Sequence, residues 1–100
     1  MMAMTAVLAL FVGAGAAGAE TQHITIDKMA FSPAQIEAKV GDTIEWNNND
    51  AFAHTATVNG GFDIMMPPKK SGSVVVKNAG TVDYYCRLHP NMKGSIKVTP

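Results

Sequence analysis

The sequence predicts an all-β fold in which two antiparallel sheets pack face to face as a sandwich. Three observations carry this prediction. Short runs alternate apolar and polar side chains, clusters of Gly, Asn, Asp and Pro separate these runs, and no stretch has the periodicity of a long helix. Seven or eight strands of four to six residues account for the chain, and their regular spacing is typical of a sandwich.

The first three strands are expected between residues 23 and 46. Ile24 and Ile26 share one face of the strand at 23–26, and residues 35–40 alternate strictly between apolar and polar side chains. A turn at Gly41-Asp42 then precedes a strand at 43–46. Each of these strands would bury one face only.

Four further strands complete the sandwich, at 55–58, 73–77, 82–86 and 95–98. Asn59-Gly60-Gly61 ends the first of them, and Pro67-Pro68 blocks regular structure before the second. Val82, Tyr84 and Cys86 share one face of the third strand. A single small domain of this kind at 20–100 is all that the length allows.

Residues 1–19 have the features of a signal peptide. No charged side chain occurs in residues 1–18, residues 6–12 are apolar, and Ala17-Gly18-Ala19 is a cleavage pattern. An uncleaved membrane anchor is the alternative, but a span needs about 20 apolar residues and this run is shorter. We therefore expect cleavage after Ala19, export to a bacterial periplasm and no stable membrane insertion of the mature chain.

Net charge and cysteine content limit the classes of partner and ligand expected for this chain. Eight basic and eight acidic residues give a formal net charge of zero, which argues against nucleic acid or an anionic membrane as partner. Cys86 is the only cysteine in the chain. It cannot form an internal disulfide, and in an oxidising compartment metal ligation would protect its thiolate.

A short segment near the C-terminus brings together a thiolate, an imidazole and a thioether, from Cys86, His89 and Met92. Soft sulfur ligands and imidazole suit copper, and a His2Cys set with a weak axial Met is typical of electron-transfer sites. The second histidine would be His23 or His54. Zinc gains nothing from a thioether, and a c-type haem needs a second cysteine. The segment therefore predicts a mononuclear copper site.

Motifs spread over nearly all of the mature chain resemble the cupredoxins, the small blue copper proteins, and among them the plastocyanins and amicyanins. The Cys-x2-His-x2-Met spacing is similar to that of amicyanin, which has the shortest such loop. The resemblance implies a Greek-key β-sandwich with one type 1 copper at one end, bound by His54, Cys86, His89 and Met92. The matching motifs are Phe31-Ser32-Pro33, Val40-Gly41-Asp42-Thr43, Trp46-Asn47-Asn48-Asn49-Asp50, His54, Tyr84-Tyr85-Cys86, His89-Pro90, Met92, Gly94 and Ile96.

The chain departs from the family at three points. The segment between His54 and Cys86 looks shorter than in amicyanin or plastocyanin, and residues 65–70 have no recognised counterpart. Thr55 stands where many blue copper proteins have an asparagine that braces the ligand loops. We expect Thr55 and Asn49 to support the ligands here, and Met65 and Met66 to form apolar surface near the copper end.

The resemblance implies a one-electron carrier that cycles between Cu(II) and Cu(I), and not an enzyme. Multicopper oxidases and nitrite reductases place a histidine beside the copper-binding cysteine, whereas Cys86 here lies between Tyr85 and Arg87. We expect electrons to pass through the exposed edge of His89. Its electron-transfer surface would comprise His89 itself and the apolar residues Pro90, Leu88 and Phe52.

The expected partner is a redox protein, whether a dehydrogenase, a cytochrome or an oxidase, that docks transiently on this small apolar surface. The carrier itself is expected to be a monomer. An alternative of a different class is a periplasmic copper-binding, delivery or buffering protein without a redox partner. In that case Met65, Met66 and His23 would act as relay ligands.

Overall fold

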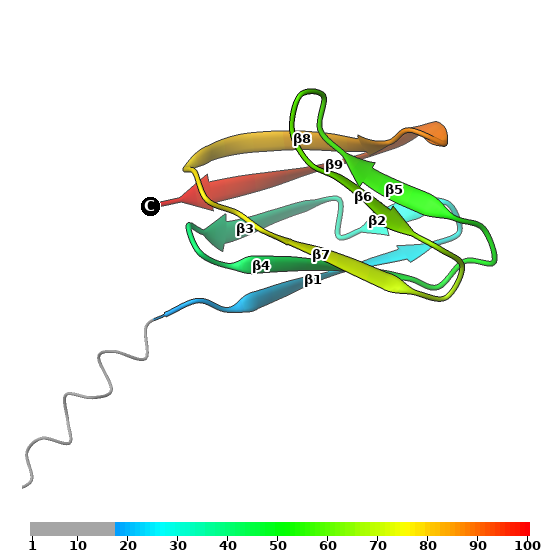
Figure 1. Cartoon of the computed structure of the whole chain (residues 1–100), viewed down its shortest axis with the longest axis horizontal. Coiled ribbons are helices and arrows are strands. Elements are labelled where there is room, and N and C mark those ends of the chain that lie inside the picture. The colour runs from blue at the N-terminus through cyan, green and yellow to red at the C-terminus, as the bar shows by residue number, and fades with distance from the viewer. Residues whose placement is uncertain (1–17) are drawn as a thin grey trace, which may run out of the picture.

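The computed structural model describes residues 18–100, which form nine strands in two sheets (Figure 1). The predicted signal peptide lies outside the described residues except for its last two positions. Among residues 18–100, no helical segment has the length and apolarity that a membrane span needs. One sheet has the order β2 (Ala30–Ser32), β1 (Thr21–Asp27), β4 (Thr43–Asn48), β7 (Ser71–Val75), and the other β3 (Gln35–Lys39), β9 (His89–Thr99), β8 (Gly80–Cys86), β5 (His54–Thr57), β6 (Asp63–Met66).

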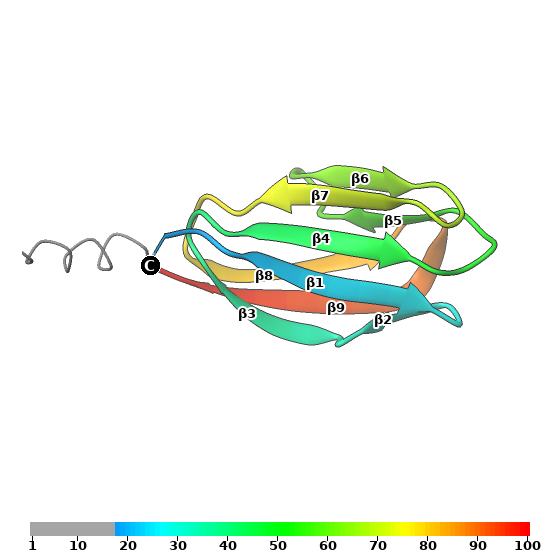
Figure 2. The same ribbon diagram turned by 90° about the horizontal axis from the view of Figure 1, so that it is seen from below.

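The predicted sandwich is confirmed, and Figure 2 shows its two layers. The described residues form nine strands instead of the expected seven or eight, and β2 and β6 are the two that the sequence pattern did not predict. Strand β2 has three residues, too few to show alternation, and β6 has no β-branched run and leads into Pro67-Pro68, which suggests a break. Five of the eight connections cross from one sheet to the other.

The expectation of purely antiparallel sheets is wrong at two places. Strand β1 pairs with β4 in parallel, and β3 pairs with β9 in parallel. Side chains alternate with a period of two in both kinds of ladder. The hydrophobic pattern therefore identifies the strands and their buried faces but not their relative direction.

Alternating apolar residues from both sheets fill the core. Ile24, Ile44 and Trp46 from one sheet and Ile96 from the other are fully buried. The ring of Tyr84 meets Trp46 edge-on, with centroids 5.3 Å apart, and meets Phe31 in the same way at 4.8 Å. Such aromatic pairs add about 0.5–1.5 kcal/mol each beyond the area they bury. They fix the two layers against each other.

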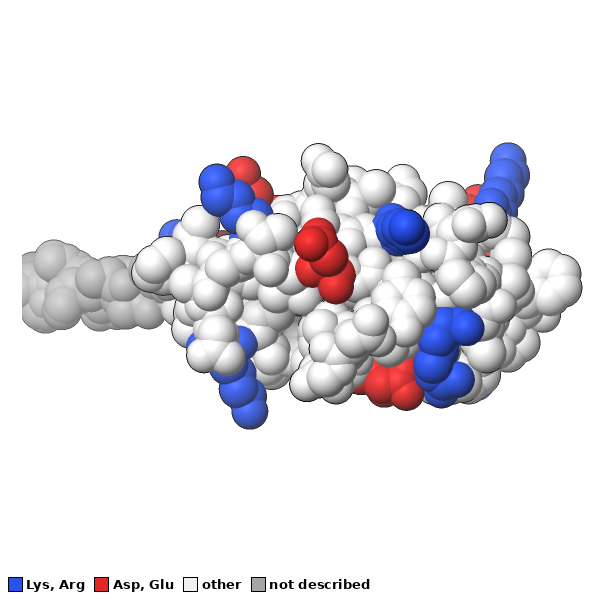
Figure 3. Space-filling view, turned by 90° about the horizontal axis from the view of Figure 1, so that it is seen from above, with Lys and Arg blue, Asp and Glu red and all other residues white. Residues whose placement is uncertain are grey.

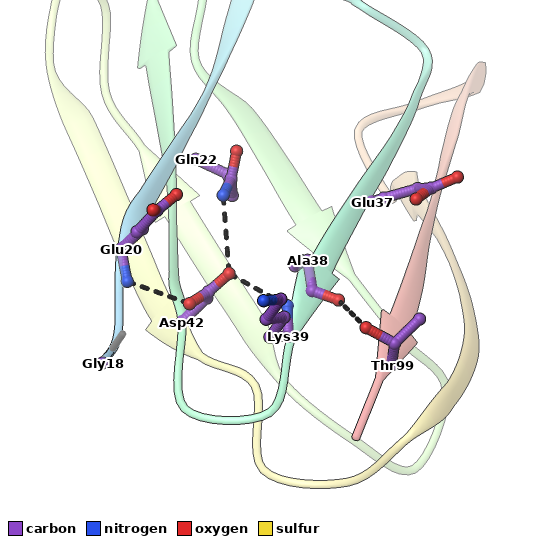
Figure 4. A pocket seen from close by; sticks show the side chains of 8 residues that line it. All are labelled: Gly18, Glu20, Gln22, Glu37, Ala38, Lys39, Asp42 and Thr99. Carbon is purple, nitrogen blue, oxygen red and sulfur yellow. Dashed lines mark hydrogen bonds between the residues drawn. The ribbon is translucent and has the colours of Figure 1, made fainter. Parts of the chain in front are cut away.

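Asp42 ties the β3–β4 turn to the start of the described chain (Figure 4). Its Oδ1 accepts a hydrogen bond from the backbone N–H of Glu20 at 2.9 Å, and its Oδ2 accepts one from the N–H of Lys39 at 2.9 Å. The side-chain amide of Gln22 adds a longer bond at 3.4 Å. The N–H of Lys39, then that of Glu20, hold the pKa of Asp42 below its ordinary value.

Candidate metal centre

Cys86 and His89 are brought together by a two-residue turn. Cys86 is the last residue of β8, His89 is the first of β9, and the two face each other as a register pair across Arg87 and Leu88. Hairpin turns of this length return the chain directly on itself. The Sγ of Cys86 lies 3.8 Å from the Nδ1 of His89, so the sharp turn that the Cys-x2-His spacing requires is present.

His54, rather than His23, is the second histidine. It is the first residue of β5, is fully buried, and presents its Nδ1 to the Sγ of Cys86 at 3.8 Å. The rings of His54 and His89 lie 4.9 Å apart between centroids. His23 is exposed in the other sheet, where its Nδ1 lies 2.9 Å from the Oε1 of Glu45.

The spacing of these donors fits one metal ion. The donor atoms of His54, Cys86 and His89 all lie within 4.8 Å of one another. A nitrogen at about 2.0 Å and a sulfur at about 2.3 Å from a shared metal ion, at a trigonal angle, would be about 3.7 Å apart. Both sulfur–nitrogen separations here are 3.8 Å. The site therefore fits a shared ion without displacement of the thiolate.

Met92 supplies the thioether of the donor set. It lies on β9 three residues beyond His89, is only 5% exposed, and lines the same surface hollow as His89, Leu88 and Met29. Two imidazoles, one thiolate and one thioether are the ligands that copper takes in electron-transfer sites. The residues present therefore fit copper, with one ion per chain.

Asp50 contacts His54 on the side away from Cys86, a contact that the sequence pattern did not predict. The Nε2 of His54 lies 2.8 Å from the Oδ2 of Asp50. The backbone N–H groups of Lys28 and Met29, which both have positive φ in the β1–β2 turn, also donate to this carboxylate at 2.8 and 3.0 Å. A donated Nε2–H leaves the Nδ1 lone pair free for a metal.

The charge of Asp50 is maintained by these bonds. Burial by itself raises the pKa of Asp50, but the N–H of Met29, the ring of His54 and the N–H of Lys28 outweigh burial and lower it overall. The sequence carried one usable signal, an aspartate four residues before a candidate ligand. That pattern is common without a metal and does not by itself indicate a partner of a ligand.

Asn48 anchors the loop between β4 and β5. Its buried Nδ2 lies 2.8 Å from the carbonyl oxygen of Phe52 and 3.1 Å from that of Met66, and its Oδ1 accepts from the N–H of Asp50 at 2.9 Å. Asn49, the expected support, has an exposed side chain, and its own carbonyl accepts a bond from Lys69. The side chain that anchors this loop is thus one position earlier than expected.

Thr55 contacts both Cys86 and the residue after it. Its backbone N–H donates to the Sγ of Cys86 at 3.3 Å, and its Oγ1 accepts from the N–H of Arg87 at 2.9 Å. Thr55 is fully buried. It therefore links β5 directly to the end of β8 that carries the thiolate.

The surface around His89 is largely apolar. Phe52 is 60% exposed and Leu88 is 43% exposed, Pro90 is exposed, and His89 is half-buried. On the face drawn in Figure 3, the extreme right-hand tip of the molecule is white, and a basic side chain stands at the upper edge of this end. Met65 is exposed as expected, but the expectation for Met66 is wrong, because it is fully buried in the core.

A two-sheet sandwich that ends in this donor set defines a type 1 copper protein. The chain belongs to the family of the cupredoxin-like domain, whose sequence model matches residues 1–98. It is 30% identical to amicyanin-alpha of Methylorubrum extorquens, over 98% of this chain and 92% of that protein. It is 33% identical to the amicyanin of Paracoccus denitrificans over 75% of this chain, and spans 63% of that relative's length.

A plastocyanin and a solved amicyanin structure are also similar to this chain. The plastocyanin of Scenedesmus fuscus is 31% identical over 70% of this chain and 87% of its own. The crystal structure of amicyanin from Paracoccus versutus superposes with a TM-score of 0.69 at 28% identity, covering 78% of this chain and 80% of that one. The fold and the donor set are thus those of a small blue copper protein, similar to amicyanin.

Proposed function

We propose that this protein is a one-electron carrier, with copper bound by His54, Cys86, His89 and Met92 as its redox group. The observation that supports this most directly is the convergence of three donors within 4.8 Å on rigid strand ends. Copper supplies the Cu(II)/Cu(I) couple when bound. The strands, Asp50 and Thr55 hold the donors in place, so little rearrangement opposes a change of oxidation state.

Electrons enter and leave through His89. His54 and Cys86 are fully buried, whereas His89 is half-buried and opens onto the apolar surface of Leu88, Pro90 and Phe52. A small apolar surface suits a short-lived complex. The partner is a redox protein, whether a dehydrogenase, a cytochrome or an oxidase, and the protein acts as a monomer with no enzymatic reaction of its own.

The same proposal includes export to the periplasm with cleavage after Ala19. The Ala17-Gly18-Ala19 cleavage pattern supports this part, and the N–H of Glu20, the next residue, bonds to Asp42 at 2.9 Å. A mature chain that starts at Glu20 would keep this contact. The mass of the protein recovered from a periplasmic fraction tests this part, and a full-length mass in the cytoplasm would contradict it.

The copper-delivery alternative receives no support from the described residues. Its relay would need Met65, Met66 and His23 near the copper site. Met66 is buried in the core, and His23 pairs with Glu45 in the opposite sheet. Of the three, Met65 alone is exposed on the sheet that carries the proposed copper ligands.

Two measurements test the carrier function. One equivalent of Cu(II) should give the wild-type protein an intense blue colour and narrow copper hyperfine splitting, and Cys86→Ser should give neither. Stopped-flow kinetics should then show electron exchange between Cu(I) and Cu(II) molecules that is faster than transfer of Cu(I) to a chelator. The reverse order would favour metal delivery.

A further inference from the structure

A ring of hydrogen bonds begins one residue after Cys86, and we call Thr55, Thr57, Asp63 and Arg87 the hydroxyl ring. The N–H of Arg87 donates to Thr55 Oγ1 at 2.9 Å, and the hydroxyls of Thr55 and Thr57 lie 2.8 Å apart. Thr57 donates to Asp63 Oδ1 at 2.7 Å. The Nε of Arg87 closes the ring on Asp63 at 3.1 and 3.2 Å.

The carboxylate sets the direction of every bond in this ring. An ionised Asp63 only accepts, so the single proton of Thr57 must point at it. Thr57 must then accept from Thr55, whose oxygen in turn accepts from the N–H of Arg87. Hydrogen bonds aligned in this way polarise and strengthen one another in a buried setting. Thr55 is fully buried and Thr57 is 7% exposed.

The ring acts where the backbone ladder is short. Strands β5 and β8 share the register pair Thr57 and Tyr85. Toward the metal centre, the two strands are joined by the N–H of Arg87 on Thr55 Oγ1 and by the N–H of Thr55 on Cys86 Sγ. The position of Thr55 against the thiolate therefore depends on the hydroxyl that the ring holds.

We propose that Thr57 and Asp63 are positioning residues for the copper site, which act through Thr55 to keep its N–H on the sulfur of Cys86. Hydrogen bonding to this sulfur tunes the potential of such sites. A donor withdraws electron density from the thiolate and so favours Cu(I), which raises the reduction potential. The proposal rests on copper at the proposed site but not on delivery of electrons to a partner.

A purely electrostatic role for Asp63 makes the opposite prediction. The pair of Asp63 and Arg87 is about half exposed, and an exposed ion pair by itself is worth little. If Asp63 acted only through its charge, its loss would destabilise the more positive Cu(II) state and raise the potential. Loss of the hydroxyl of Thr57 would change no charge and leave the potential where it was.

Reduction potentials of four copper-loaded variants separate the two roles. Thr57→Val and Asp63→Ala should both lower the potential and shift the thiolate absorption band, and Thr57→Ser should restore the wild-type values of both. Glu45→Gln is the control for loss of a partly exposed carboxylate away from the ring, because Glu45 contacts His23 in the other sheet. A potential that rises in Asp63→Ala, or that is unchanged in Thr57→Val, overturns the proposal.

Hydrogen exchange in the metal-free protein gives a second, independent readout. The amide of Arg87 should exchange faster in Thr57→Val and in Asp63→Ala than in the wild type, while Glu45→Gln matches the wild type. Equal rates in all four would overturn the proposal. A wild-type protein that failed to turn blue would instead defeat the proposed function, because the exchange measurement needs no copper.

Discussion

Asp50 and His54 form a 2.8 Å hydrogen bond on the side of the imidazole that faces away from Cys86. The two ring nitrogens of His54 thus have different roles: Nε2 contacts the carboxylate, and Nδ1 faces Cys86 and is available to bind a metal ion. Because Asp50 also accepts from the N–H groups of Lys28 and Met29, the first turn of the fold is connected to a buried ligand through one side chain.

Removal of this carboxylate should weaken copper binding. We expect Asp50→Ala to lower the affinity by about 10–100-fold, the range found when partners of ligating histidines are removed. Competition with a Cu(II) chelator measures the change. Asp27→Ala, at an exposed aspartate on the end of β1, is the control. Equal affinities for the two variants would show that His54 needs no orienting group.

A charge on the apolar surface should slow electron exchange without altering the copper site. Electron self-exchange requires two molecules to bring their apolar surfaces together, and in Leu88→Lys both surfaces carry a positive charge. Placing like charges against each other costs several kcal/mol. We expect the self-exchange rate to fall by about tenfold or more, since each 1.4 kcal/mol corresponds to a factor of ten. NMR line broadening in mixtures of Cu(I) and Cu(II) protein measures this rate.

Val40→Lys is the matched control for this prediction. Val40 and Leu88 are both 43% exposed, but Val40 follows β3 at the other end of the sandwich, where its N–H bonds to Thr99. It should exchange at the wild-type rate. Equal slowing by both substitutions would mean that overall charge, and not the surface around His89, controls the encounter.

The parts of the fold that the sequence predicted are those that depend on local pattern. Ile24, Ile26, Ile44 and Trp46 are all fully buried, as their alternation requires. Strand direction, by contrast, is set by which strands meet after the chain has crossed between layers. The parallel pairing of β1 with β4 is therefore not expressed in either strand alone.

The residues of the metal centre fall into the same two groups, those predicted from local sequence pattern and those whose role depends on the folded chain. The spacing of Cys86, His89 and Met92 lies within one hairpin and could be predicted locally, whereas resemblance was needed to select His54. Asn48 and Asp50 act by joining loops that are distant in sequence, to Met66 and to Lys28. Such contacts exist only in the folded chain, and no periodicity indicates them.

Met92→Gln should keep copper but change its potential and colour, because the axial ligand tunes this kind of site. Visible absorption, EPR and a redox titration measure the effect. Met65→Gln provides the control, since Met65 is 45% exposed and Met92 only 5%. If the spectra of Met92→Gln matched those of the wild type, Met92 would be a core residue and not a ligand.

The metal-free protein should lose stability in acid partly because Asp42 becomes protonated. Asp42→Asn should therefore reduce the dependence of stability on pH. Its pKa is held below the ordinary value by the N–H groups of Lys39 and Glu20. A depressed folded-state pKa gives stability that is present above the unfolded value of about 3.9 and is lost as the pH falls through the folded value. Urea midpoints of both proteins between about pH 2 and pH 7 measure this.

The difference in urea midpoint between wild type and Asp42→Asn should be largest near neutrality and shrink in acid, because protonation of Asp42 then removes the charge that the substitution has already removed. A gap that stayed constant over this range would mean that the geometry of the bonds in Figure 4, and not the charge of Asp42, stabilises this turn.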